Sequence, residues 1–156
     1  KSIDKKALIV DTRFNGGGNL HDALSDFLNG KKVFDILPRG QSVGYEPYDK
    51  WIKPSIVLMG ECNYSDAHLF PVEYKIRNIG KTLGMPVPGT GTFVWWENQI
   101  DPDLVFGIPQ GGWRMPDGRL CENTQLEPDI KVRNEPALST NGTDQQIEAA
   151  VKELMK

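Results

Sequence analysis

The sequence of 156 residues is poor in the residue types that build metal sites, and it has no long apolar run. Two cysteines and two histidines are too few for a zinc cluster, and we expect no metal or other cofactor. A net charge of −3 gives no reason to expect nucleic acid or an anionic membrane as a partner. No stretch of about 18 apolar residues is present, so we expect no membrane span. No signal-peptide pattern begins at Lys1, although a mature form or an excised fragment would have lost one.

The composition is typical of one soluble globular domain. Hydrophobic residues make up 38 % and charged residues 25 %, while 16 glycines and 11 prolines indicate many turns. Short apolar runs at 7–10 and 55–59 predict two adjacent, buried central strands. Helical spacing follows from about 19 and over 66–80, and Thr143 is expected to cap a closing amphipathic helix. This alternation predicts an α/β layered domain.

A run of three glycines follows the first strand, in the segment Asp11-Thr12-Arg13-Phe14-Asn15-Gly16-Gly17-Gly18. Such glycines let the backbone approach a ligand and present N–H groups to an anion, which is either a phosphate or a transient oxyanion. The pattern G-x-G-x-x-G and a P-loop lysine are both absent, so nucleotide binding fits poorly. A tight strand-to-helix turn explains the segment equally well.

A serine stands between the second strand and its helix, in Gly60-Glu61-Cys62-Asn63-Tyr64-Ser65-Asp66-Ala67. A hydroxyl at this edge of a sheet meets helix-terminal amides, as a nucleophile requires. The alternative is an ordinary capping serine, with Asp66 complementing the helix dipole. Further along, Glu122 in Cys121-Glu122-Asn123 is a candidate to orient a base, although such a glutamate is more often a solvated loop charge.

The order of these segments resembles the catalytic domain of the tricorn and C-terminal processing (tail-specific) peptidases. The resemblance runs from about 6 to 132 and includes the pattern Gly-Thr-x-Thr-Phe at 89–93. It implies a crotonase-like layered α/β domain, with a central mixed sheet flanked by helices. Because the first strand lies so near Lys1, we interpret 1–156 as the C-terminal part of the catalytic core of a larger protein.

The resemblance implies a serine endopeptidase with Ser65 as the nucleophile. Tail-specific members carry a lysine in the segment that corresponds to 93–96, and this sequence has none there. Tricorn-like members have Ser-Asp at the nucleophile, as Ser65-Asp66 does. Glu122 then matches the glutamate of their Ser-His-Ser-Glu tetrad. The implied oxyanion hole consists of an amide from the glycine run, Gly16 or Gly17, and the amide of Asp66.

The base histidine of tricorn-like members lies upstream of the first motif, so it is expected outside this chain. We interpret His21 as a partly exposed helix residue, and His68 as too close to Ser65 along one helix to align as a base. The expected partners are a peptide or protein substrate, the missing N-terminal catalytic and PDZ-like regions, and further copies in a homo-oligomer. A periplasmic or secreted location is favoured over the cytoplasm.

Two other functions remain open. The domain could be a catalytically inactive crotonase-like module that binds peptide or an apolar ligand, as retinoid-binding relatives of this fold do, or a structural half of an oligomeric protease. The dense aromatic residues suit an apolar groove, although core and inter-subunit packing is the more ordinary explanation. Cys62 and Cys121 flank the proposed site and are expected to be neighbours, either as two free buried thiols or as one disulfide.

Overall fold

The computed structural model describes residues 4–156 and is built on a sheet of four strands in the order β1-β4-β5-β8. The strands are β1 (Leu8–Asp11), β4 (Ser55–Met59), β5 (Lys81–Gly84) and β8 (Ile130–Lys131). β1 pairs directly with β4, which confirms the expected adjacency. The α/β class is confirmed as well. The sheet formed by the described strands is parallel and not mixed, because the antiparallel strands form separate hairpins.

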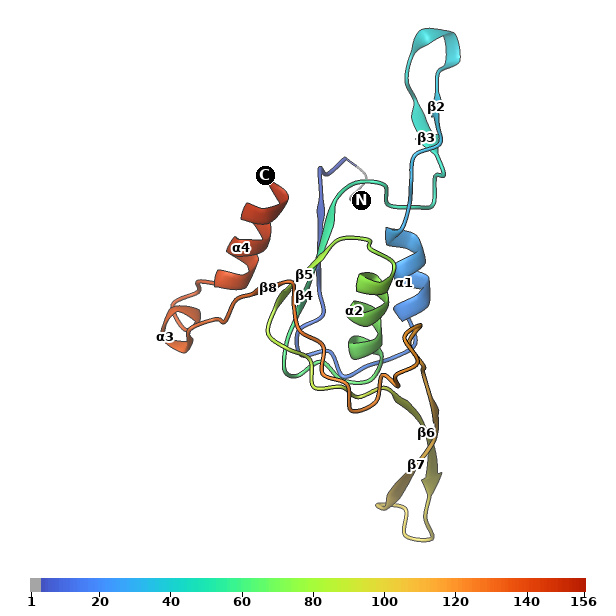
Figure 1. Cartoon of the computed structure of the whole chain (residues 1–156), viewed down its shortest axis with the longest axis vertical. Helices are drawn as coiled ribbons and strands as arrows, with labels where there is room; N and C mark the ends of the chain where they lie inside the picture. Colours follow the sequence, from blue (N-terminus) through green and yellow to red (C-terminus); the bar gives the residue numbers. More distant parts are fainter. Residues whose placement is uncertain (1–3) are drawn as a thin grey trace.

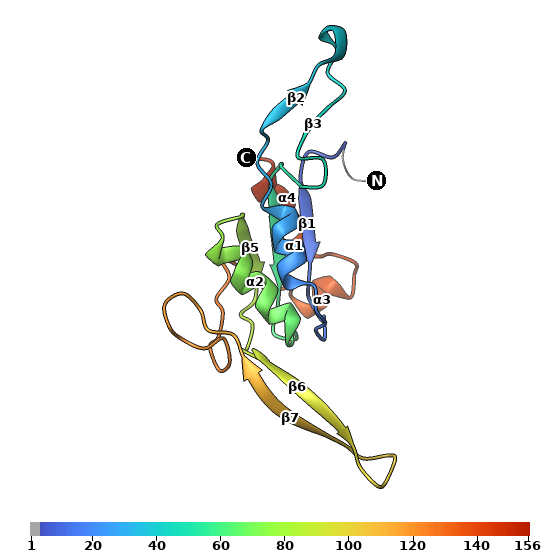
Figure 2. The same cartoon turned by 90° about the vertical axis from the view of Figure 1, so that its right-hand side faces the viewer.

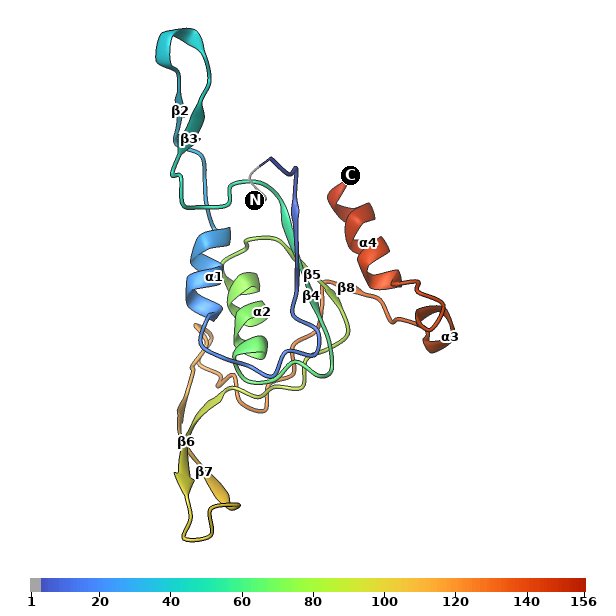
Figure 3. The same cartoon turned by 180° about the vertical axis from the view of Figure 1, so that it is seen from behind.

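Helices cover both faces of this sheet (Figures 1 and 3). The four helices are α1 (His21–Leu28), α2 (Asp66–Ile76), the short α3 (Pro136–Ser139) and α4 (Gln145–Leu154). α1 and α2 lie side by side on one face, while α4 packs on β4 and β5 from the other. β4 is therefore buried on both sides, as its continuous apolar sequence requires. Val57 packs with α1 and α2, whereas Ile56 and Leu58 pack with Ala150 of α4.

Two hairpins extend from opposite ends of the body (Figures 1 and 2). Their strands are β2 (Phe34–Ile36) with β3 (Gly44–Glu46), joined through a 3₁₀ turn at Pro38–Gly40, and β6 (Thr92–Asn98) with β7 (Val105–Gly112). Trp51 is buried in the core, but Trp95 and Trp96 on β6 are more than half exposed. Core packing therefore explains only part of the aromatic content.

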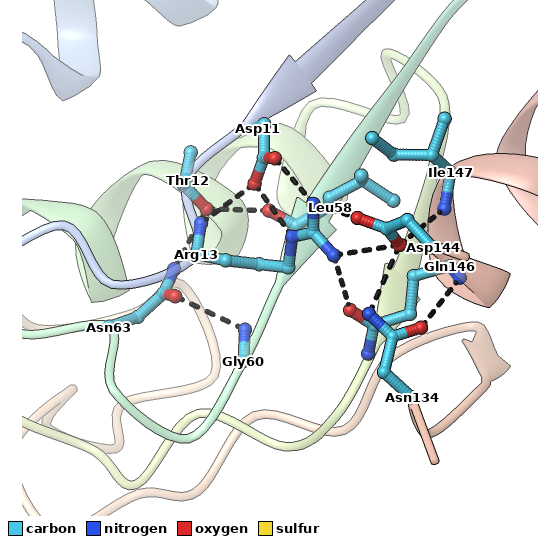
Figure 4. Close-up of polar contacts among 10 residues, drawn as sticks. All are labelled: Asp11, Thr12, Arg13, Leu58, Gly60, Asn63, Asn134, Asp144, Gln146 and Ile147. Carbon is cyan, nitrogen blue, oxygen red and sulfur yellow. Dashed lines mark hydrogen bonds and ion pairs between the residues drawn. The ribbon is translucent and has the colours of Figure 1, made fainter. Parts of the chain in front are cut away.

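Asn63 is the buried residue that lets α2 contain a proline. Pro71 has no N–H to offer the carbonyl of Ala67, and Nδ2 of Asn63 donates to that carbonyl at 2.8 Å instead. The same amide donates to Oγ1 of Thr12 at 2.8 Å, and its oxygen accepts from the N–H of Gly60 at 3.1 Å (Figure 4). Asn63 thus ties the ends of β1 and β4 to the start of α2.

Arg13 joins the end of β1 to the last helix (Figure 4). Its guanidinium donates to both carboxylate oxygens of Asp11, to both of Asp144 at 2.8 and 3.1 Å, and to Gln146 at 2.8 Å. Asp144 also caps α4, a role that the sequence had assigned to Thr143. The Asp-x-Arg part of the glycine motif is therefore structural, since it fixes α4 on the sheet.

The hydrogen bonds of Arg13 should make the free energy of unfolding depend on pH in the acidic range. Hydrogen bonds from Arg13 hold the pKa values of Asp11 and Asp144 below the usual carboxyl range. A lowered folded-state pKa adds stability above about pH 4, and that stability is lost as pH falls through the folded values. Arg13→Gln should lower the free energy of unfolding by about 1–3 kcal/mol at pH 7 and flatten its decline towards pH 3.

Urea unfolding between pH 7 and pH 3 measures this difference. Arg119→Gln is the matched control, because Arg119 pairs with Asp117 on the exposed surface, where ion pairs contribute little. Equal acid dependence in the wild type and in Arg13→Gln would show that the network does not couple to folding.

Candidate active site

Ser65 lies at the sharp turn between β4 and α2, at the carboxyl edge of the sheet. Its backbone angles are φ 54° and ψ −119°, a region that residues with a side chain rarely adopt. Such strain costs about 1–3 kcal/mol and is concentrated at functional sites. The hydroxyl makes no capping hydrogen bond to α2, so the interpretation of Ser65 as an ordinary capping serine is wrong.

A loop from a distant part of the chain holds Ser65 in this conformation. The N–H of Ser65 donates to Oγ1 of Thr90 at 2.9 Å. The neighbouring N–H of Gly91 donates to Oε2 of Glu122 at 2.6 Å. Glu122 therefore fixes the loop that fixes Ser65, and it lines the same cavity as Ser65. Glu122 is therefore not a freely solvated loop charge.

The glycine run lies directly against Ser65. A Cβ on Gly17 would lie 2.8 Å from Cβ of Ser65 and 3.3 Å from its Oγ, and φ of Gly17 is +107°. Only glycine fits at this position without displacing the serine. The N–H of Gly17 donates to Oδ1 of Asn15 at 2.8 Å, so it is already engaged. Within residues 4–156, the amides of Gly16 and Asp66 donate to no protein acceptor, and both residues line the cavity with Ser65.

The cavity has a volume of about 530 Å³, which suits a small-molecule or peptide ligand. Its polar lining includes Ser65, Asp66 and Glu122. Aromatic side chains from the β6–β7 hairpin and the segment after it also line it: Phe93, Trp96 and Trp113. The structure thus brings the three sequence motifs to one place.

The two histidines occupy very different environments. His68 is fully buried beneath the turn, and neither ring nitrogen has a hydrogen-bond partner in the described part of the chain. Burial lowers the pKa of His68, while the charge of Glu122 opposes that shift. His21 lines the cavity, and its Nδ1 lies 2.5 Å from Oδ1 of Asp66. His21 is the partly exposed helix residue that the sequence predicted, but its contact with Asp66 was not predicted.

The cysteines are both free thiols in the structure. Cys62 is exposed and borders a small cavity near Arg13, so the expected pair of buried thiols is wrong for this residue. Cys121 is buried against Leu69 and Val72, and burial raises the pKa of its thiol. They line different cavities, and no disulfide joins them.

Among residues 4–156, no cluster of three or more His, Cys, Asp or Glu side chains is arranged to hold a metal ion. Within the same range, no helix is both long enough and apolar enough to cross a bilayer.

Comparison with known proteins gives one consistent result. The model of the family described as Peptidase family S41 matches residues 1–132. Tricorn protease of Thermoplasma acidophilum is 26 % identical over 152 residues, which cover 97 % of this chain and 14 % of that protein. The crystal structure of the tricorn protease aligns with a TM-score of 0.84 at 26 % identity, over 97 % of this chain and 15 % of that one.

A photosystem II D1 C-terminal processing protease shares the fold, with a TM-score of 0.56 at 20 % identity over 82 % of this chain and 35 % of that one. The chain spans about one seventh of the length of the tricorn protease that it matches. The chain therefore belongs to peptidase family S41, a family of serine-type peptidases, and it is similar to the tricorn protease.

Proposed function

We propose that this chain carries the nucleophile and oxyanion hole of a serine endopeptidase. Oγ of Ser65 attacks the carbonyl carbon of a peptide bond as a base removes the hydroxyl proton. The amides of Asp66 and Gly16 stabilise the oxyanion of the tetrahedral intermediate. Collapse of that intermediate releases the amine, and water then hydrolyses the acyl-enzyme ester on Ser65.

The observation that carries this proposal is the strained backbone of Ser65 next to two unengaged amides in one cavity. Strain at a turn persists only where the surrounding structure enforces it, and here Thr90 and Gly17 both do so. Glu122 has a supporting role, because it anchors the loop that holds the N–H of Ser65 and is available to orient a base from another segment.

The base comes from outside this chain in our proposal. Within residues 4–156, no imidazole makes a hydrogen bond to Oγ of Ser65. The relatives are much longer proteins, and this chain covers only a small share of them. We therefore propose that the complete protein adds an upstream histidine, a PDZ-like region and assembly into a homo-oligomer, and that it acts in the periplasm or outside the cell.

A fluorophosphonate probe tests the proposal on the natural full-length protein. The probe should label one site, in the peptide that contains Ser65, and Ser65→Ala should abolish the label. Ser42→Ala is the matched control, because Ser42 lies exposed near the turn of the β2–β3 hairpin, away from the cavity. Labelling that survives in Ser65→Ala would place the nucleophile elsewhere.

An inactive binding module is the second candidate function, because four aromatic side chains line the cavity: Tyr64, Phe93, Trp96 and Trp113. This alternative predicts no covalent label on Ser65 and saturable binding of a fluorescent fatty acid. Trp96→Ala should weaken that binding, while Trp95→Ala should not, because Trp95 does not line the cavity.

A further inference from the structure

Asp66 serves the site with two groups of opposite electrostatic effect. Its backbone N–H is the proposed oxyanion donor, while its side chain is a carboxylate with only 11 % of its surface exposed. The carboxylate accepts from the N–H of Leu20 at 2.8 Å and from the N–H of His21 at 3.4 Å. Both donors belong to the N-terminal end of α1, which attracts negative charge.

A carboxylate this close to a developing oxyanion should slow the reaction. Two negative charges in a partly desolvated cavity repel each other more strongly than in water. The third contact of Asp66 can reduce this repulsion. Nδ1 of His21 lies 2.5 Å from Oδ1 of Asp66. An imidazolium at this position would make the pair neutral overall while the oxyanion forms.

The ring of His21 is held in place for this contact. It packs edge-on against Trp113 with the ring centroids 5.6 Å apart, and Trp113 packs in the same manner against Phe93 at 5.3 Å. The His21 side chain is 15 % exposed and faces the cavity. These contacts leave the ring few other orientations.

We propose that His21 is a positioning residue of the Ser65 site: it fixes the Asp66 carboxylate and compensates its charge during acylation. This inference rests on the proposed function, since it assumes that the amide of Asp66 binds the oxyanion. The compensation requires a positive charge on the ring, which a neutral side chain at this position cannot supply. Charged groups around His21 come from several elements, and they line the two cavities that the ring borders: Asp22, Asp66, Glu73, Arg114 and Glu122.

The test is the rate of fluorophosphonate labelling of Ser65 in the natural full-length protein. His21→Asn keeps a hydrogen-bond donor near the position of Nδ1 but carries no charge. We expect labelling about 10-fold slower than wild type, because the charge of Asp66 is then left uncompensated in a partly desolvated cavity. In an Asp66→Asn background, His21→Asn should add no further loss.

His21→Gln serves as a second neutral variant, and thermal unfolding checks that each variant is folded. A loss that persists in the Asp66→Asn background would overturn the proposal, because His21 would then act independently of the Asp66 carboxylate. Wild-type rates in both neutral variants would also overturn it. In that case the proposed function would still stand if Ser65→Ala loses the label. An unlabelled Ser65 in the wild type would reject the proposed function itself.

Discussion

Residues 1–156, purified without the rest of the protein, should hydrolyse peptides at least about 10⁴-fold more slowly than the full-length protein. Removal of the base from a Ser-His-Asp enzyme leaves only the rate that binding and the oxyanion hole supply. The described chain places no imidazole in hydrogen-bond contact with Oγ of Ser65, and His68 is buried away from the cavity. Hydrolysis of a fluorogenic peptide library by both proteins measures the difference.

Ser65→Ala and His68→Ala in the isolated chain complete this experiment. Neither substitution should change the residual rate of the isolated chain by more than a few-fold. Substantial turnover by the isolated chain that His68→Ala abolishes would show that the base lies on α2. The proposed division of the catalytic residues between this chain and an upstream segment would then be wrong.

Gly17→Ala should reduce labelling of Ser65 by about 10²–10³-fold in the full-length protein. The added methyl group would lie 2.8 Å from Cβ of Ser65, closer than atoms pack, and 3.1 Å from the carbonyl oxygen of Tyr64, which is a tight contact. Relief requires the glycine run or the serine to move, and a shift of about 1 Å is enough to cost 10²-fold in rate. Loss of one oxyanion donor has an effect of similar size.

Gly142→Ala is the matched control for this substitution. Gly142 also has a positive φ, +84°, but a Cβ there would meet no atom within 4 Å. Both variants carry the backbone cost of alanine at positive φ, about 1 kcal/mol, and Gly17→Ala adds the cost of its contact with Ser65, so thermal unfolding should shift more in Gly17→Ala. Only Gly17→Ala should lose labelling. Equal labelling of the two variants would mean that Gly17 is not part of the Ser65 site.

The parts of the fold that the sequence predicted are those encoded by local patterns. The apolar run at 55–59 is buried on both faces, and this is why it could be identified as a central strand. Gly17 and Ser65 were expected to meet, because the resemblance to the peptidase family implied an oxyanion hole formed by both segments, and the pairing of β1 with β4 brings them together. The carboxyl ends of adjacent parallel strands lie at the same edge of a sheet.

The features that the sequence did not predict depend on contacts between distant residues. β6 was not identified, because Thr92–Asn98 gains its strand character from pairing with β7 and not from burial. His21 looked like an ordinary helix residue, since Asp66 lies 45 positions away. Nothing local to Asp11 or Arg13 indicates that their partner is Asp144 near the other end of the chain.

Asn63 has a consequence for the choice of expression host. Asn63-Tyr64-Ser65 has the N-x-Ser pattern that the glycosylation machinery of a eukaryotic secretory pathway recognises. The side chain is 1 % exposed, and both hydrogens of its amide are donated, to Thr12 and to the carbonyl of Ala67. A sugar attached during translation would remove one of these hydrogens and occupy a space that the fold does not have. Secreted production in such a host would therefore give a misfolded fraction, whereas a bacterial host avoids the modification.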